Sequence, residues 1–185
     1  MVRTFYDEMY DASGAVRPHY CEFARWLAET PDDLLAQRRR EADLLFHRAG
    51  ITFTLYGDDQ GTERLIPFDI IPRAIPASEW RIVERGCIQR VQALNLFLAD
   101  LYHDQRIIKA GIIPAEQVLA NEGYQMAMQG LDLHRDIYAH IAGVDLVRDG
   151  DGSYYVLEDN LRTPSGVSYM LEDRKMMMRL FPELF

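Results

Sequence analysis

Apolar residues recur every three or four positions over the first part of the chain, a spacing that predicts two amphipathic helices. The first is expected to begin at Pro18, because proline is favoured at the first helical position. The second is predicted to begin at Pro31, with Thr30 as its hydroxyl cap and two acidic residues in its first turn, and to stop at Gly50. Its predicted buried residues are Leu35, Ala42, Leu45, Phe46 and Ala49.

Between 51 and 76 the apolar runs become short and are separated by turn residues. Residues 51–56 and 62–66 favour strands, and 57–61 has the composition of a turn, so we predict a β-hairpin. Three prolines between 67 and 76 predict an extended, irregular segment. Its apolar residues are expected to lie on the core.

A long helix is predicted from 79 to 102, with Ser78 as its cap. Its apolar stripe consists of Val83, Cys87, Val91, Leu94, Leu98 and Leu101. Short helices are expected at 104–110 and 114–120. Apolar and polar residues then alternate at 137–141, 144–148 and 153–159, which predicts antiparallel strands, and helical spacing returns at Val167.

These elements predict an α+β fold, in which a partial antiparallel sheet is flanked by helices. A length of 185 residues fits a single domain. Within it we expect three parts: N-terminal helices and a hairpin at 1–76, a helical part at 77–136, and strands with a following helix at 137–185.

Acidic residues gather on the strands of the last third. If Asp151-Gly152 is a two-residue hairpin loop, Asp145 lies directly opposite Glu158, and Asn160 shares their face. Two opposed carboxylates repel each other without a cation, and with an amide oxygen they form a ligand set suited to Mg²⁺ or Mn²⁺. A loop at Asp149-Gly150 would instead pair Asp145 with Tyr154, which leaves a surface hairpin with scattered acids as the alternative.

The charge of the chain narrows the class of partner. A net charge of −9 and a pI near 5.0 argue against a nucleic-acid-binding protein, which needs a basic face. They leave a nucleotide ligand open, because a metal ion can supply the positive charge. The start of the chain has no apolar signal-like stretch and no apolar run is long enough for a membrane span, so we predict a cytoplasmic protein without a membrane partner.

Four stretches of the sequence resemble the circularly permuted ATP-grasp ligases related to glutathionylspermidine synthase. They are GITFTLYGD, IPFDIIPRAIPASEW, QRVQALNLFLADLY and YYVLEDNLRTPSGVSYMLEDR. The resemblance implies that Asp145, Glu158 and Asn160 bind the Mg²⁺ or Mn²⁺ ions that bridge the phosphates of ATP. It also implies that Arg162 steadies the transferred phosphoryl group.

Three more residues are candidates for cofactor or substrate binding. Ser165 and Gly166 match the loop that faces the second substrate, where amide hydrogens at a helix start hold an anion. Arg73 lies between prolines in a stretch that the resemblance covers. It is expected either to reach phosphate or substrate, or to form a structural salt bridge.

The resemblance implies an ATP-dependent carboxylate–amine ligase, which forms an amide through an acyl phosphate and releases ADP. Its partners would be ATP and a small carboxylate, amine or peptide substrate. In permuted members the metal-ligand strands come first, and the lysines that grip the nucleotide come later. Only Lys109 and Lys175 are lysines here, and neither lies beside a glycine-rich loop, so the chain is expected to carry the metal-binding edge alone and to be inactive in isolation.

Two other functions compete with this interpretation. One is a truncated, non-catalytic ATP-grasp-like module for binding or association, and the other is a metal-dependent hydrolase that uses the same carboxylates. We also expect the isolated chain to form a homodimer through apolar residues that a missing lobe would otherwise cover. They are Val156, Met170, Met177, Met178, Leu180 and Phe181.

Overall fold

The computed structural model describes residues 5–50, 52–54, 63–65 and 68–184, and it has the predicted α+β class, with helices and two small antiparallel sheets. The chain forms two compact units. The first contains residues 1–76 and 165–185, and the second contains residues 77–164. Residues 165–185 therefore group with the N-terminal segment, and the expectation of a single domain stays a prediction.

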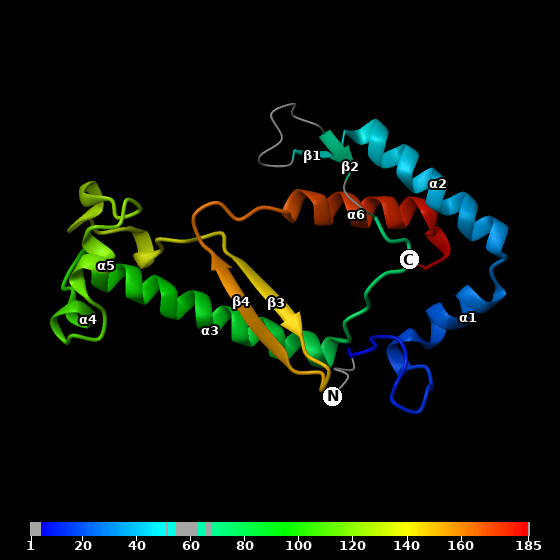
Figure 1. Cartoon of the computed structure of the whole chain (residues 1–185), viewed down its shortest axis with the longest axis horizontal. Helices are drawn as coiled ribbons and strands as arrows, with labels where there is room; N and C mark the ends of the chain where they lie inside the picture. The colour runs from blue at the N-terminus through cyan, green and yellow to red at the C-terminus, as the bar shows by residue number, and fades with distance from the viewer. Residues whose placement is uncertain (1–4, 51, 55–62, 66–67, 185) are drawn as a thin grey trace. The chain divides into compact units, whose positions relative to one another are not determined.

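The first unit is built around two helices that lie side by side, α2 and α6 (Figure 1). Its elements are η1 (Pro18–Tyr20), α1 (Cys21–Glu29), α2 (Asp32–Ala49), β1 (Thr52–Thr54), β2 (Glu63–Leu65), α6 (Val167–Leu180) and η4 (Pro182–Leu184). β1 and β2 pair in an antiparallel sheet, as predicted. The turn predicted at 57–61 lies outside the described residues.

The core of this unit joins residues that are far apart in the sequence. Ala42 and Ile70 pack with the C-terminal end of α6 and with Phe181, and Phe46 packs with Met176. The ring of Trp26 meets that of Phe181 edge to face, with 5.1 Å between centroids. The proline-rich segment lies on the core as expected, because Ile70 is buried and residues 68–76 contain no helix or strand.

Three predictions about this unit are wrong. The Thr30 hydroxyl donates to the Trp26 carbonyl, which ends α1, so it does not cap α2. Ala49 is exposed because it is the last residue of α2, beyond the part that α6 covers. Met177, Leu180 and Phe181 do not form an exposed patch, because they are buried in the core. Met170 and Met178 are exposed, as expected.

The second unit contains the long helix and a β-hairpin, with short helices after the helix end (Figure 1). Its elements are α3 (Ala77–Tyr102), α4 (Arg106–Lys109), α5 (Ala115–Leu119), η2 (Met126–Met128), η3 (His134–Asp136), β3 (Gly143–Arg148) and β4 (Tyr154–Asn160). Every residue of the predicted stripe on α3 is buried or half-buried. The helix begins at Ala77, so Ser78 lies in its first turn and is not the cap. Among the described helices, none is both long and apolar enough to cross a membrane.

The segment 137–141 is not a strand, although its alternating pattern predicts one. The side chain of Asn95 on α3 makes hydrogen bonds of the kind that a neighbouring strand would make. Its Oδ1 accepts hydrogen bonds from the amides of Tyr138 and Ala139 at 2.7 and 2.9 Å, and its Nδ2 donates to the Ala139 carbonyl at 3.1 Å. One helix side chain thereby satisfies backbone groups that a sheet would otherwise pair.

Candidate functional site

The loop between β3 and β4 has three residues, so the predicted two-residue loop is wrong. The Asp149 amide donates to Ser153 O and the Gly152 amide to Asp149 O, each at 2.9 Å. A two-residue loop of the expected type needs positive φ at both Asp151 and Gly152, but only Gly152 has it, at 89°. Asp151 has a Cβ that disfavours this conformation, and its carboxylate accepts a hydrogen bond from the Ser153 amide, which lowers the pKa of Asp151.

A β-bulge nevertheless places Asp145 opposite Glu158. The strands pair Arg148 with Tyr154 and Leu146 with Val156, and the register shifts between Leu146 and Asp145. Without the shift, the three-residue loop would pair Asp145 with Leu157 and turn Glu158 to the other face. Leu157 is the extra residue of the bulge. The predicted pairing of Asp145 with Glu158 is confirmed, but a three-residue loop and a bulge produce it instead of a two-residue loop.

Asn160 lies on the same face and joins the two acids. Its Nδ2 donates to Glu158 Oε1 at 3.1 Å and is 3.4 Å from Asp145 Oδ1. The amide group therefore bridges the carboxylates at the end of the hairpin. All three side chains are exposed or half-exposed, so a ligand can reach them.

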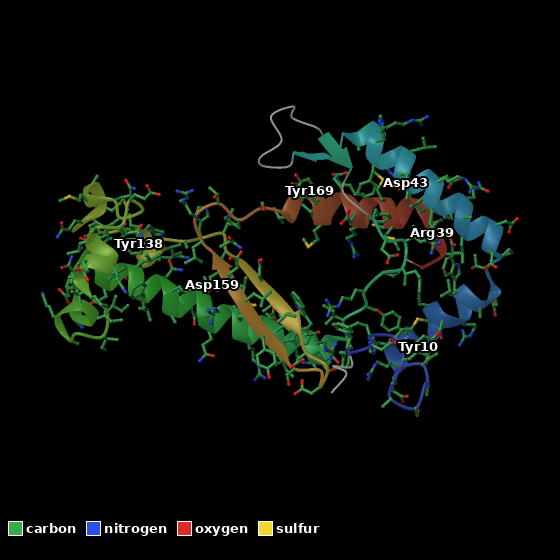
Figure 2. All side chains as sticks on the ribbon, in the orientation of Figure 1. Tyr10, Arg39, Asp43, Tyr138, Asp159 and Tyr169 are labelled. Atoms are coloured by element: carbon green, nitrogen blue, oxygen red, sulfur yellow. The ribbon has the colours of Figure 1, made fainter. Side chains whose placement is uncertain are left out.

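Two ion pairs join the opposite face of the hairpin to α3, one through Asp159 and one through Arg148. Arg90 of α3 donates to both Asp159 oxygens, at 2.7 and 2.8 Å, and the Asp159 carboxylate raises the pKa of Arg90. Arg148 forms an ion pair with Glu79 at 2.9 Å. Figure 2 labels Asp159 on β4. These ion pairs hold the hairpin to α3.

Asp145 and Glu158 have no cationic partner within the described part of the chain. Two carboxylates and an amide are hard oxygen ligands, and a divalent cation would replace the amide N–H in bridging them. The described residues contain no group of three or more His, Cys, Asp and Glu side chains that could hold a metal ion. Two carboxylates and one amide leave coordination positions of a divalent cation that phosphate oxygens and water could fill.

Arg162 follows the last residue of β4 by two positions and lines a cavity. The volume of this cavity is about 750 Å³, and its wall comes from the end of α3, the segments 121–128 and 138–139, and residues 161–162. The loop after β4 lies close to β3, because a Cβ at Gly143 would stand 3.1 Å from Cβ of Pro164. Arg162 therefore lies two positions after Asn160 in the chain, and it lines a cavity of the second unit.

The other predicted residues belong to the first unit. Gly166, with φ 95°, is the N-cap of α6, and as a glycine it has no side chain that could cap the amides of the first turn. Ser165 precedes it and is exposed. Arg73 Nε donates to Glu8 Oε1 at 2.9 Å, and the two residues form an ion pair. The structure therefore shows Arg73 in the salt bridge that was the alternative to phosphate binding.

Residues 72–185 match a family described as a circularly permuted ATP-grasp. This match covers more than half of the chain. The chain belongs to the circularly permuted ATP-grasp family. All three residues of the hairpin face, and Arg162 after it, lie inside the matched range.

Related proteins extend the comparison over nearly the whole chain. An uncharacterised protein of Synechocystis sp. is 45% identical over 181 residues, which are 98% of this chain and 38% of that protein. An uncharacterised protein of Mycobacterium tuberculosis H37Rv is 44% identical over 180 residues, 97% of this chain and 32% of the relative. A Frankia casuarinae protein provisionally named as a glutamate–cysteine ligase is 41% identical over 182 residues, 98% of this chain and 21% of that protein. The chain thus spans well under half the length of each of these relatives.

The residues around the Arg162 cavity were missed by the sequence analysis. Tyr102, Glu122 and Tyr138 come from three separate segments, and none belongs to a motif of recognisable spacing. Only packing brings them together. The spacing of these residues in the sequence therefore gives no signal for the cavity.

Proposed function

We propose that this chain carries the metal-binding edge of an ATP-dependent carboxylate–amine ligase. The ligase would be active in a complete protein that is longer than this chain, as the relatives are. The observation that carries the proposal is the convergence of Asp145, Glu158 and Asn160 on one face of the hairpin, without a cationic partner in the described residues. Membership of the ATP-grasp family and the provisional ligase name of the Frankia relative support it.

Asp145, Glu158 and Asn160 would hold Mg²⁺ or Mn²⁺ together with phosphate oxygens of ATP. The bound ion would neutralise phosphate charge during transfer of the γ-phosphoryl group. By holding the ion, the three side chains would fix the position of the phosphates and so orient the nucleotide. Asn160 would rotate its amide so that oxygen faces the ion, because in the metal-free arrangement its N–H group lies between the acids.

Arg162 would contact the carboxylate substrate and the developing acyl phosphate, with a guanidinium that forms no hydrogen bond or ion pair within the described residues. The uncapped amides at the start of α6, after Ser165 and Gly166, would hold an anionic group of a substrate. An amine then attacks the acyl carbon, the C–N bond forms, and phosphate leaves. The closer likeness to glutathionylspermidine synthase and a cytoplasmic location are part of this proposal.

The test is Glu158→Gln in the complete protein. This change keeps the side-chain shape but removes one of the two opposed charges, so ADP formation should fall by at least about 100-fold. The melting temperature should stay the same or rise, because the repulsion between Asp145 and Glu158 is relieved. Glu84→Gln, on the exposed surface of α3, is the matched control and should change neither quantity.

The opposite pattern would refute the proposal. If Glu158→Gln retains ADP formation and lowers the melting temperature, Glu158 has a structural role. If the wild-type protein forms no ADP with any acid and amine, the alternative of a non-catalytic ATP-grasp-like module gains support.

A further inference from the structure

The Arg162 cavity contains two opposite charges that do not pair with each other. Arg162 lines it from the end of the hairpin, and Glu122 lines it from the segment between α5 and η2. Within the described residues, neither the Arg162 guanidinium nor the Glu122 carboxylate has a hydrogen bond or an ion pair. Two separated, unpaired charges in one cavity favour a ligand that carries both signs of charge.

Part of the cavity wall is aromatic and apolar. The ring of Tyr102 stacks with those of Tyr124 and Tyr138, with centroid distances of 5.0 and 5.7 Å and nearly parallel planes. Tyr102 and Tyr138 line the cavity together with Leu98, Met128, Ala139 and Leu161. This wall offers a flat surface to an apolar or aromatic group.

Hydrogen bonds to backbone amides fix residues of the cavity wall. Asn95 fixes the amides of Tyr138 and Ala139, and the Gln125 amide donates to the Tyr102 hydroxyl at 3.2 Å. The Tyr138 pKa is raised by burial and then by the nearby Asp136 and Asp132, so its hydroxyl remains neutral at physiological pH. Its ring therefore adds no charge to the wall. Figure 2 labels Tyr138 in the segment beside the C-terminal end of α3.

The volume of the cavity matches a small ligand. At about 750 Å³ it lies within the range of roughly 300–1,000 Å³ that is typical of small-molecule sites. It has room for more than one amino-acid residue. Its apolar wall with a few polar groups at the edge is also typical of such sites.

We propose that this cavity binds the carboxylate substrate of the ligase, and that this substrate is an α-amino acid or short peptide with an apolar or aromatic side chain. Its carboxylate contacts Arg162, its ammonium group contacts Glu122, and its side chain packs on Tyr138 and the apolar residues of the wall. The role as substrate rests on the proposed function, whereas the binding does not. The carboxylate then lies at the end of the hairpin whose last residue is Asn160, where phosphoryl transfer is proposed.

The test is calorimetric titration of the complete protein, without ATP, with L-phenylalanine and L-alanyl-L-phenylalanine. Two analogues that lack one charge, 3-phenylpropionate and phenethylamine, are compared with them. We expect at least one zwitterion to bind about tenfold or more tightly than either analogue, because each analogue leaves one charged side chain without a partner. The affinities of the amino acid and of the dipeptide, compared with each other, show which size of ligand the cavity binds more tightly.

Three variants locate the binding. Glu122→Gln should weaken zwitterion binding about tenfold and leave binding of 3-phenylpropionate unchanged, and Arg162→Gln should weaken both. Glu116→Gln, an exposed acid of α5 that does not line the cavity, is the control and should have no effect. Thermal unfolding of each variant checks that the fold is retained.

Equal affinity for all four ligands, no binding of either zwitterion, or full affinity in Glu122→Gln would each overturn the assignment of the cavity. The outcome for the ligase is separate. If the zwitterion binds with the expected charge dependence but no ADP forms with any amine, the binding assignment stands and the proposed function fails.

Discussion

At the scale of single residues, Asn95 fixes part of the cavity wall. Its side chain bonds the backbone of Tyr138 and Ala139 in the segment 137–141. Its amide makes contacts with Val91 O, Ala139 O and the amides of Tyr138 and Ala139, between 2.7 and 3.1 Å. Tyr138 then lines the cavity with its ring in a defined place.

Asn95→Ala should therefore destabilise the second unit. The change leaves the amides of Tyr138 and Ala139 without their acceptor, which is expected to cost about 1–3 kcal/mol of unfolding free energy. Chemical denaturation measures this cost. Gln92→Ala, an exposed residue one turn earlier on α3, is the control and should change the free energy by less than about 0.5 kcal/mol. A loss in Asn95→Ala no larger than that of the control would show that water replaces the amide contacts.

At the scale of elements, the hairpin β3–β4 decides where the candidate metal ligands lie. Its three-residue loop shifts the register of the strands by one residue, and its bulge at Leu157 shifts it back. The two shifts cancel, so Asp145 pairs with Glu158. The ion pairs of Arg90 and Arg148 then hold the other face against α3. The site depends on the loop, the bulge and the helix contacts at once.

The two glycines of this loop give a matched test. Gly152 has φ 89°, whereas Gly150 does not have a positive φ. Gly152→Ala should cost about 1 kcal/mol of stability, because a Cβ disfavours the left-handed conformation. Gly150→Ala should cost much less, and the difference appears in thermal unfolding curves of the two variants. Equal costs would mean that the loop changes to a different turn when Gly152 is replaced.

At the scale of the molecule, α6 has two apolar faces. Met176, Met177 and Leu180 face the core of the first unit. A second stripe is exposed and consists of Val167, Met170, Leu171 and Met178. Because one face of α6 is already covered, the second stripe is the part of this helix that is available for association with another chain.

Self-association of the chain stays a prediction, but the variant that tests it must change. Phe181→Glu would place a charge in the core and unfold the unit, because Phe181 is fully buried. Met170→Glu is the suitable variant, and it should convert a dimer to a monomer in light scattering across a dilution series. Ser168→Glu adds the same charge at an exposed position of the same helix and is the control. A wild-type chain that is monomeric at every concentration would contradict the prediction.

The sequence by itself determined the features that depend on local periodicity. Helical spacing predicted α2, α3 and α6 to within a few residues, and strand alternation placed Glu158 and Asn160 on one face. A residue two positions along a strand shares a face wherever no bulge intervenes, and the bulge at Leu157 lies before Glu158. The ATP-grasp resemblance likewise depends on short runs of residues and needs no tertiary contact.

Tertiary structure decided the features that depend on contacts between residues far apart in the chain. The alternation at 137–141 is a strand pattern, but Asn95 pairs its backbone, so no strand forms. The apolar residues of α6 look alike in sequence, and only packing against α2 distinguishes buried Met177 from exposed Met178. Glu122 and Arg162 lie forty positions apart, and their joint cavity exists because the chain folds back on the end of α3. Free energies of burial and hydrogen bonding depend on which groups meet, and the periodicity of a segment carries no information about its distant neighbours.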